Sequence, residues 1–313
     1  MSQKEEFVVF KDERYNIINN SLAIEFKGIK NISEIEGFNH LKNLKNLILK
    51  NNIIEEITEL KNFPGLEQLN LSNNNIKNIT GLDTLYNLKI LELGNNSIEK
   101  IEGLDALTNL NILCLHCNNI KNIEKLSNLI NLSDLILNNN EIAEIKNLTH
   151  LLNINRITLS HNKIKTIKGL KNLRNLKFLY LDFNDLIEIE NLNNLNSLIT
   201  LNLSNNKIKE IKGLDNLTYL GELNLSNNNI HEIKGLENFK SSLFKINLQG
   251  NNIDSSIFDQ INNIDSFWEG QKYVKYCRHN IVKKNKKNSN FVKYKGKYHF
   301  LWDNQLELSH LGT

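Results

Sequence analysis

Residues 195–214, LNSLITLNLSNNKIKEIKGL, hold one complete copy of a unit that repeats along most of the chain. Leu201 and Leu203 are separated by a single residue, which is the spacing of a short strand with one apolar face. Ile208 and Ile211 follow at a spacing of three, which suits 3₁₀ or irregular turns. The unit therefore predicts a short strand, a turn and an irregular segment on the opposite side.

An asparagine recurs at one phase of this unit, where the strand pattern ends. The spacing is 22 residues for nine members and 23 for the last, so one continuous repeat array is expected rather than separate domains. An asparagine amide offers two donors and an acceptor, and we predict that it pairs buried main-chain groups of its own and the adjacent unit. This asparagine ladder comprises Asn52, Asn74, Asn96, Asn118, Asn140, Asn162, Asn184, Asn206, Asn228 and Asn251. Asparagines at other phases are interpreted as AT-rich coding bias.

The composition and the N-terminal residues indicate in which cellular compartment the chain is expected. The first residues, MSQKEEFVVFKDERY, are charged, and no apolar stretch reaches the length of a membrane span, so neither a secretory signal nor a transmembrane helix is predicted. The three cysteines Cys114, Cys117 and Cys277 fit a reducing compartment better than a disulfide framework. We therefore expect a cytoplasmic protein. Residues 1–270 carry 28 basic and 33 acidic side chains, whereas residues 271–298 carry ten basic and none acidic.

The pattern LxxLxxLxLxxNxIxxIxGL resembles the leucine-rich repeat family, specifically its 22-residue subclass. That subclass includes the leucine-rich-repeat regulatory subunit of protein phosphatase-1 and the bacterial internalins. The resemblance implies an α/β solenoid, a right-handed leucine-rich-repeat horseshoe with a concave parallel β-sheet, an irregular or 3₁₀ convex side and caps at both ends. Internalins are secreted and usually carry proline near the convex turn. Pro64 is the single proline here and no export signal is predicted, which favours similarity to the phosphatase subunit.

The chain divides into four segments by pattern. Residues 1–21 form an N-terminal cap with a hairpin, and residues 22–254 form about eleven repeats of 22 residues. Residues 255–290 are predicted as a helical C-terminal cap, with a helix over about 267–281, followed by a basic linker. Residues 291–313 resemble residues 7–29 without a gap and are predicted as a second hairpin. We expect that this C-terminal hairpin allows self-association.

Side chains that flank the inward leucine of each strand should face the concave surface. These positions are polar near both ends of the array, whereas several are large or apolar in the middle. A contiguous exposed apolar and aromatic surface marks an interaction site, although scattered exposed apolar residues need no ligand. We predict that a protein partner binds a concave patch made of Ile90, Glu92, Ile112, Cys114, His116, Asp134, Ile136, Arg156, His161, Phe178, Tyr180, Asp182, Phe183 and Glu222.

Other chemistries are less well supported by the sequence. Cys114, His116 and Cys117 suggest a metal site, but a structural zinc needs four ligands and a second close pair is lacking nearby. No phosphate loop and no hydrolase or metalloprotease motif occurs. The prediction is therefore a non-enzymatic scaffold or regulatory subunit without catalytic residues, cofactor or metal, and the resemblance names a phosphatase-type partner. The alternative is a recruitment factor that contacts nucleic acid or anionic membrane through the basic residues 272–298.

Overall fold

A computed structural model describes residues 6–41, 43–239, 242–266 and 269–288, with side chains up to Ile281. Residues Met1–Cys277 form one compact unit, and Arg278–Thr313 form a second. The predicted hairpin at 291–313 and residues 289–298 of the basic segment lie outside the described residues.

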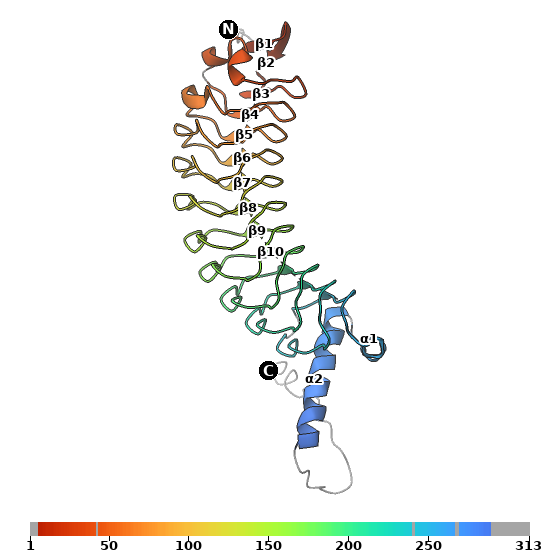
Figure 1. The fold of residues 1–313 in the computed structure, drawn as a ribbon. Helices are drawn as coiled ribbons and strands as arrows, with labels where there is room; N and C mark the ends of the chain where they lie inside the picture. The colour runs from red at the N-terminus through yellow and green to blue at the C-terminus, as the bar shows by residue number, and fades with distance from the viewer. Residues whose placement is uncertain (1–5, 42, 240–241, 267–268, 289–313) are drawn as a thin grey trace, which may run out of the picture. The chain divides into compact units, whose positions relative to one another are not determined.

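An eleven-stranded sheet runs through the first unit, with its strands in sequence order from β3 to β13 (Figure 1). Neighbouring strands are parallel and in register; Leu179 of β10, for example, pairs with Leu201 of β11. This topology confirms the predicted solenoid. The strands are β3 (Ser21–Ala23), β4 (Asn46–Ile48), β5 (Gln68–Asn70), β6 (Ile90–Glu92), β7 (Ile112–Cys114), β8 (Asp134–Ile136), β9 (Arg156–Thr158), β10 (Phe178–Tyr180), β11 (Thr200–Asn202), β12 (Glu222–Asn224) and β13 (Lys245–Asn247).

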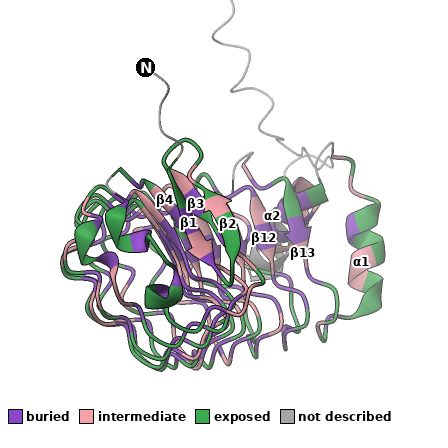
Figure 2. Cartoon of the chain, turned by 90° about the horizontal axis from the view of Figure 1, so that it is seen from above, coloured by how far each residue is buried: buried purple, intermediate pink, exposed green. Residues whose placement is uncertain are grey.

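The aliphatic residues of the repeats are buried in the interior of the coil. Figure 2, which looks along the stack, marks the buried stretches of each repeat in purple. Within a unit such as 195–214, the inward leucines and isoleucines are fully buried. The convex side consists mainly of turns, with short 3₁₀ helices near the N-terminus. These are η1 (Ile32–Glu34), η2 (Phe38–His40) and η3 (Leu60–Asn62).

A hairpin precedes the array. Strands β1 (Phe7–Phe10) and β2 (Glu13–Asn16) are antiparallel, and Lys11 and Asp12 between them have positive φ values of 49° and 62°. Both turn residues are therefore left-handed, as a tight two-residue hairpin requires. Val8 and Phe10 are buried against the first repeat.

The ladder asparagines join successive repeats. Asn162 Nδ2 donates to the carbonyl oxygens of Leu137 at 3.0 Å and Leu159 at 3.1 Å, and Asn162 Oδ1 accepts from the Ile142 N–H at 2.9 Å. One amide thus satisfies main-chain groups of its own repeat and of the preceding one, and the other members of the ladder repeat this pattern. Because these main-chain groups are buried, leaving them unpaired would be costly.

Asparagines outside the ladder also bind across repeats. Asn153 Nδ2, for example, donates to the Ile130 carbonyl oxygen at 3.0 Å. Equivalent bonds recur at one phase of the unit, from Asn87, Asn109, Asn131, Asn153 and Asn175, each to a carbonyl oxygen 23 residues earlier. The interpretation of these residues as coding bias therefore overlooks a structural role.

Two helices follow the array. Helix α1 (Ser255–Asn262) begins after Asp254, whose side chain accepts from the Ser256 N–H, and this helix was not predicted. Helix α2 (Glu269–Asn288) begins close to the predicted helix but continues beyond 281 into the predicted linker. Val274 and Cys277 of α2 are buried, as a cap requires, whereas Ile281 is exposed. None of the described helices is long and apolar enough to cross a bilayer.

Candidate protein-binding surface

The concave surface is formed by the outer positions of each strand. In β10, Leu179 is fully buried, while Phe178 and Tyr180 on either side of it are half-buried. Ile90, Ile112 and Ile136 hold corresponding positions on earlier strands and are also half-buried. Parallel register brings these side chains from β6 to β10 onto one face.

Three positions after each strand of the array lies a residue whose backbone is in the left-handed region, with a positive φ. This turn row includes Asn51, Asn73, Asn95, Asn139, Asn205 and Asn227, with φ between 53° and 59°, and ends at Gly250 with φ 71°. Asparagine and glycine tolerate this conformation, whereas bulkier side chains cost about 1–3 kcal/mol there. Cys117, His161 and Phe183 occupy the same row with φ of 53°, 54° and 53°. Cys117 and Phe183 therefore replace asparagine against the local conformational preference, whereas histidine tolerates this conformation better. The exposed Phe26, with φ 58°, is a similar exception in the first repeat.

His161 and Phe183 stack on each other in neighbouring repeats. Their ring centroids are 4.0 Å apart and the rings are 10° from parallel. Phe183 nevertheless stays 45% exposed, so one face of the pair is available to a ligand. Asp182 precedes Phe183, and its Oδ1 accepts from Ser160 Oγ at 2.6 Å and from Asn202 Nδ2 at 3.0 Å. The carboxylate is thereby held at the edge of the concave surface.

Arg156 connects charged and aromatic members of the patch. Its Nε lies 3.5 Å from Asp134 Oδ1, and its guanidinium carbon lies 5.1 Å from the centroid of the Phe178 ring. Arg156 therefore neutralises Asp134 and covers one side of Phe178. Glu222 lies near Lys245, at 4.0 Å, beside a hollow of about 260 Å³ that Tyr180 also lines.

One member of the predicted patch is not exposed. Cys114 is 8% exposed, because the His116 side chain lies beside it with Nδ1 2.9 Å from Cys114 Sγ. Burial raises the pKa of the Cys114 thiol to about 11, so this cysteine stays a neutral thiol. His116 in turn covers Gly94, where a Cβ would collide with the imidazole ring. Access to Cys114 from the concave side is therefore restricted, contrary to the prediction.

His116 completes a small hydrogen-bonded cluster. Asn95 Nδ2 lies 3.1 Å from His116 Nε2; since the amide is the donor, Nε2 is the acceptor and Nδ1 carries the proton towards Cys114. Burial lowers the pKa of His116, which favours this neutral form. Within the described residues, no group of three metal-ligating side chains is found.

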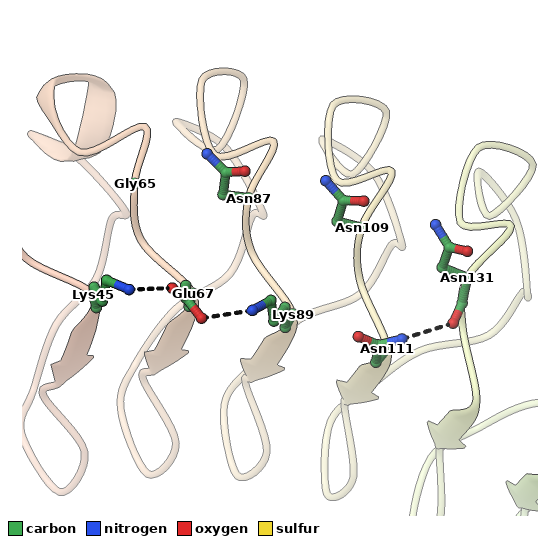
Figure 3. A pocket seen from close by; sticks show the side chains of 8 residues that line it. All are labelled: Lys45, Gly65, Glu67, Asn87, Lys89, Asn109, Asn111 and Asn131. Carbon is green, nitrogen blue, oxygen red and sulfur yellow. Dashed lines mark hydrogen bonds and ion pairs between the residues drawn. The ribbon is translucent and has the colours of Figure 1, made fainter.

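A second hollow, of about 640 Å³, lies before the strands of the N-terminal half and was not singled out from the sequence (Figure 3). Glu67 at its rim lies 2.8 Å from Lys45 Nζ and 2.7 Å from Lys89 Nζ. These lysines lower the pKa of Glu67 to about 2. Asn87 and Asn109, which line the hollow, donate to carbonyl oxygens of preceding repeats. Its polar groups are thus engaged in joining the repeats.

Comparisons with known proteins agree with this architecture. A family model described as Leucine Rich repeats (2 copies) matches residues 64–106. The chain is similar to the internalin InlF from Listeria monocytogenes str. 4b F2365, with 28% identity over 75% of this chain and 68% of that chain, and a TM-score of 0.70. Comparison with curated proteins yields no match.

Two further solved structures share the fold. A leucine-rich-repeat protein from Leptospira interrogans is 24% identical over 76% of this chain and 72% of that chain, with a TM-score of 0.62. The functional domain of InlJ from Listeria monocytogenes is 22% identical over 74% of this chain and 53% of that chain, with a TM-score of 0.62. Internalins are thus among the similar structures, although Pro64 and the N-terminus led us to favour the phosphatase-subunit branch, which stays a prediction. Residues 64–106 match the leucine-rich-repeat model, and the array from β3 to β13 has the fold of a leucine-rich-repeat solenoid.

Proposed function

We propose that the chain is a binding scaffold and that a protein partner contacts the concave patch around β10. Leucine-rich-repeat proteins generally act as protein-interaction scaffolds. We infer the location of this binding site from the turn row. There His161 and Phe183 stand where most other repeats have asparagine, and Phe183 does so at a conformational cost. A stacked, half-exposed aromatic pair that costs stability is better explained by binding than by folding.

The proposal is tested by the double substitution Phe178→Ala with Tyr180→Ala. Both side chains are half-buried on the concave face and make no main-chain hydrogen bonds of the ladder type. We expect loss of partner capture with little change in melting temperature. Asn46→Ala with Ile48→Ala, at the same positions of β4, is the matched control and should retain capture. Undiminished capture by the β10 variant would place the partner elsewhere.

The resemblance to the phosphatase regulatory subunit makes a phosphatase catalytic subunit the first partner to examine. The acidic and aromatic residues Asp134, Phe178, Tyr180 and Glu222 are of the type that this resemblance implies for partner contacts. Co-purification of a protein phosphatase-1 catalytic subunit with the chain, lost in the β10 double variant, would support that partner. A complex unaffected by the double variant would contradict it. The cytoplasmic location expected from the sequence is checked by fractionating cells that express the full chain.

A further inference from the structure

The aromatic stack that follows β9 and β10 is packed on one face, and a large part of the Phe183 ring remains exposed. The Phe183 ring packs against the His161 ring at a centroid distance of 4.0 Å, yet 45% of Phe183 remains exposed. The face of an aromatic ring carries negative electrostatic potential and attracts a cation placed above it. The His161 ring, which is nearly parallel to the Phe183 ring, fixes the orientation of Phe183 and of its exposed part.

A carboxylate precedes Phe183 in the chain, at Asp182. Asp182 Oδ1 is oriented by hydrogen bonds from Ser160 Oγ at 2.6 Å and Asn202 Nδ2 at 3.0 Å. Among the described residues, no lysine, arginine or histidine lies within ion-pair distance of Asp182. Asp134 differs in this respect, because Arg156 lies 3.5 Å from it. Asp182 therefore presents a fixed negative charge without an internal counter-ion.

The surrounding concave surface has the same sign. Glu92 on β6 accepts from Asn70 Nδ2 at 2.7 Å and, like Asp182, has no basic partner in the described part of the chain. Arg156 is engaged with Asp134 and Phe178, and burial lowers the pKa of His116, which keeps its imidazole neutral. Between β6 and β10 the uncompensated charges are thus carboxylates, so the complementary partner surface is basic.

We propose that the concave patch receives a basic segment of its protein partner, with an arginine guanidinium on the open face of Phe183 and an N–H donated to Asp182. This inference rests on the proposed function, because it names the chemistry of the partner at that same surface. Arginine fits better than lysine, since its planar guanidinium stacks on a ring while its N–H groups bind a carboxylate. Lysine supplies only a point charge at this position.

The site is tested on the full chain with N-acetyl-arginine amide as the probe, titrated at millimolar concentration while the His161 ring resonances are followed by NMR. We expect saturable shifts at His161 and weaker ones with N-acetyl-lysine amide. N-acetyl-citrulline amide, which is planar but uncharged, should cause almost none. Equal shifts with citrulline would overturn the proposal, as would arginine-induced shifts that leave His161 and Phe183 unaffected.

Two variants separate the site from the fold. Asp182→Asn keeps an acceptor for Ser160 and Asn202 but removes the charge, and it should weaken arginine binding about tenfold or more. Phe183→Asn restores the residue usual in the turn row and should weaken binding similarly without unfolding the repeat. Arginine binding that persists in both variants would contradict the site.

Capture of the natural partner distinguishes the two proposals. If Phe178→Ala with Tyr180→Ala abolishes capture while Asp182→Asn leaves it intact, the concave patch is supported as the binding surface. The assignment of an arginine to Asp182 is then wrong. If Asp182→Asn lowers capture and added salt lowers it further, a basic segment is supported. Capture that is unchanged in all variants places the partner outside the concave patch, which overturns the proposed location and with it the assignment of a basic partner segment.

Discussion

Cys117, His161 and Phe183 occupy a backbone conformation that suits asparagine better than themselves. Six other members of the turn row are asparagine, whose short polar side chain tolerates the left-handed region. At the residue scale, the proposed binding surface is therefore distinguished by side chains that lower the stability of the turn they occupy.

Phe183→Asn should increase the free energy of unfolding by about 1 kcal/mol, because it removes a bulky side chain from the left-handed region. Denaturant unfolding monitored by circular dichroism measures the change. The reverse substitution in the next repeat, Asn205→Phe, is the matched control and should destabilise by a similar amount. Destabilisation by Phe183→Asn would mean that the aromatic stack outweighs the conformational cost.

Asn162→Ala should lower the free energy of unfolding by about 1–3 kcal/mol, because it leaves buried main-chain groups unpaired. Asn153→Ala in the same part of the array removes one exposed hydrogen bond to Ile130 and should cost about 1 kcal/mol or less. Equal losses in the two variants would show that the ladder holds no special role. Thermal denaturation of both variants beside the wild type decides between these outcomes.

Glu67 provides a pH-dependent test. Lys45 and Lys89 lower its pKa from 4.5 to about 2 in the folded chain, so its contribution to stability is present above pH 4.5 and is lost as the pH falls towards 2. The melting temperature of the wild type should therefore exceed that of Glu67→Gln at pH 7. The difference should be small because the ion pairs are exposed, and it should vanish near pH 2. Glu56→Gln is the control, since Glu56 is exposed and no ion pair of it is found among the described residues. A difference that persists at pH 2 would contradict the ion-pair origin.

Some features of single residues could be predicted from the sequence and others could not. The period of 22 predicted the strands and their register because a leucine must face inward in every unit. The left-handed turn row was also readable, since paired asparagines such as Asn51–Asn52 mark turns, but only the second of each pair was used. The burial of Cys114 was not readable, because it depends on the His116 ring folding back over Gly94.

At the scale of elements, the C-terminal cap takes the place of a twelfth repeat. Carbonyl oxygens that precede each strand normally accept N–H groups of the following repeat; Gly221 O, for example, accepts from Phe244 and Lys245. After β13, Gly270 of α2 donates to the Phe244 carbonyl oxygen at 3.1 Å instead. Helix α1 was missed because it has only eight residues, although Asp254 before it is a favourable N-cap residue.

Gly270→Ala should destabilise the cap by about 1–3 kcal/mol, because an added Cβ is forced against packed backbone. That Cβ would lie 2.7 Å from the Leu243 carbonyl oxygen. Gly65→Ala is the matched control, since a Cβ there meets nothing within 4 Å. Hydrogen exchange of the β13 amides should accelerate in Gly270→Ala and stay unchanged in Gly65→Ala. Equal exchange in both would show that α2 does not protect the last strand.

At the scale of the whole array, every strand pairs only with its sequence neighbours. The ladder bonds likewise reach one repeat back, as from Asn206 to Leu181. Stability in such an array is close to a sum of repeat and interface terms. The strand positions that flank the buried central residue were predictable for the same reason, since each position recurs at a known phase. The pairing of Arg156 with Asp134 required side-chain geometry.

Deleting residues 53–74 removes one full period and should leave a folded, cooperative array with a somewhat lower melting temperature. Deleting the shorter segment 53–63 removes half a period and should be far more damaging, because inward and outward positions no longer coincide. Circular dichroism melts of the two deletion variants provide the comparison. Better folding of the shorter deletion would contradict a strictly periodic core.

The same one-repeat reach of the asparagine amides has a mechanical consequence. Tension applied to the two ends of the array loads the terminal interfaces first, since no bond found among the ladder residues bypasses a repeat. Repeats should then peel away singly, each releasing about 75 Å of extended chain. Single-molecule force spectroscopy would record this as a regular sawtooth. Under load the array would thus unfold in small steps of one repeat each, and the repeats that remain would stay folded.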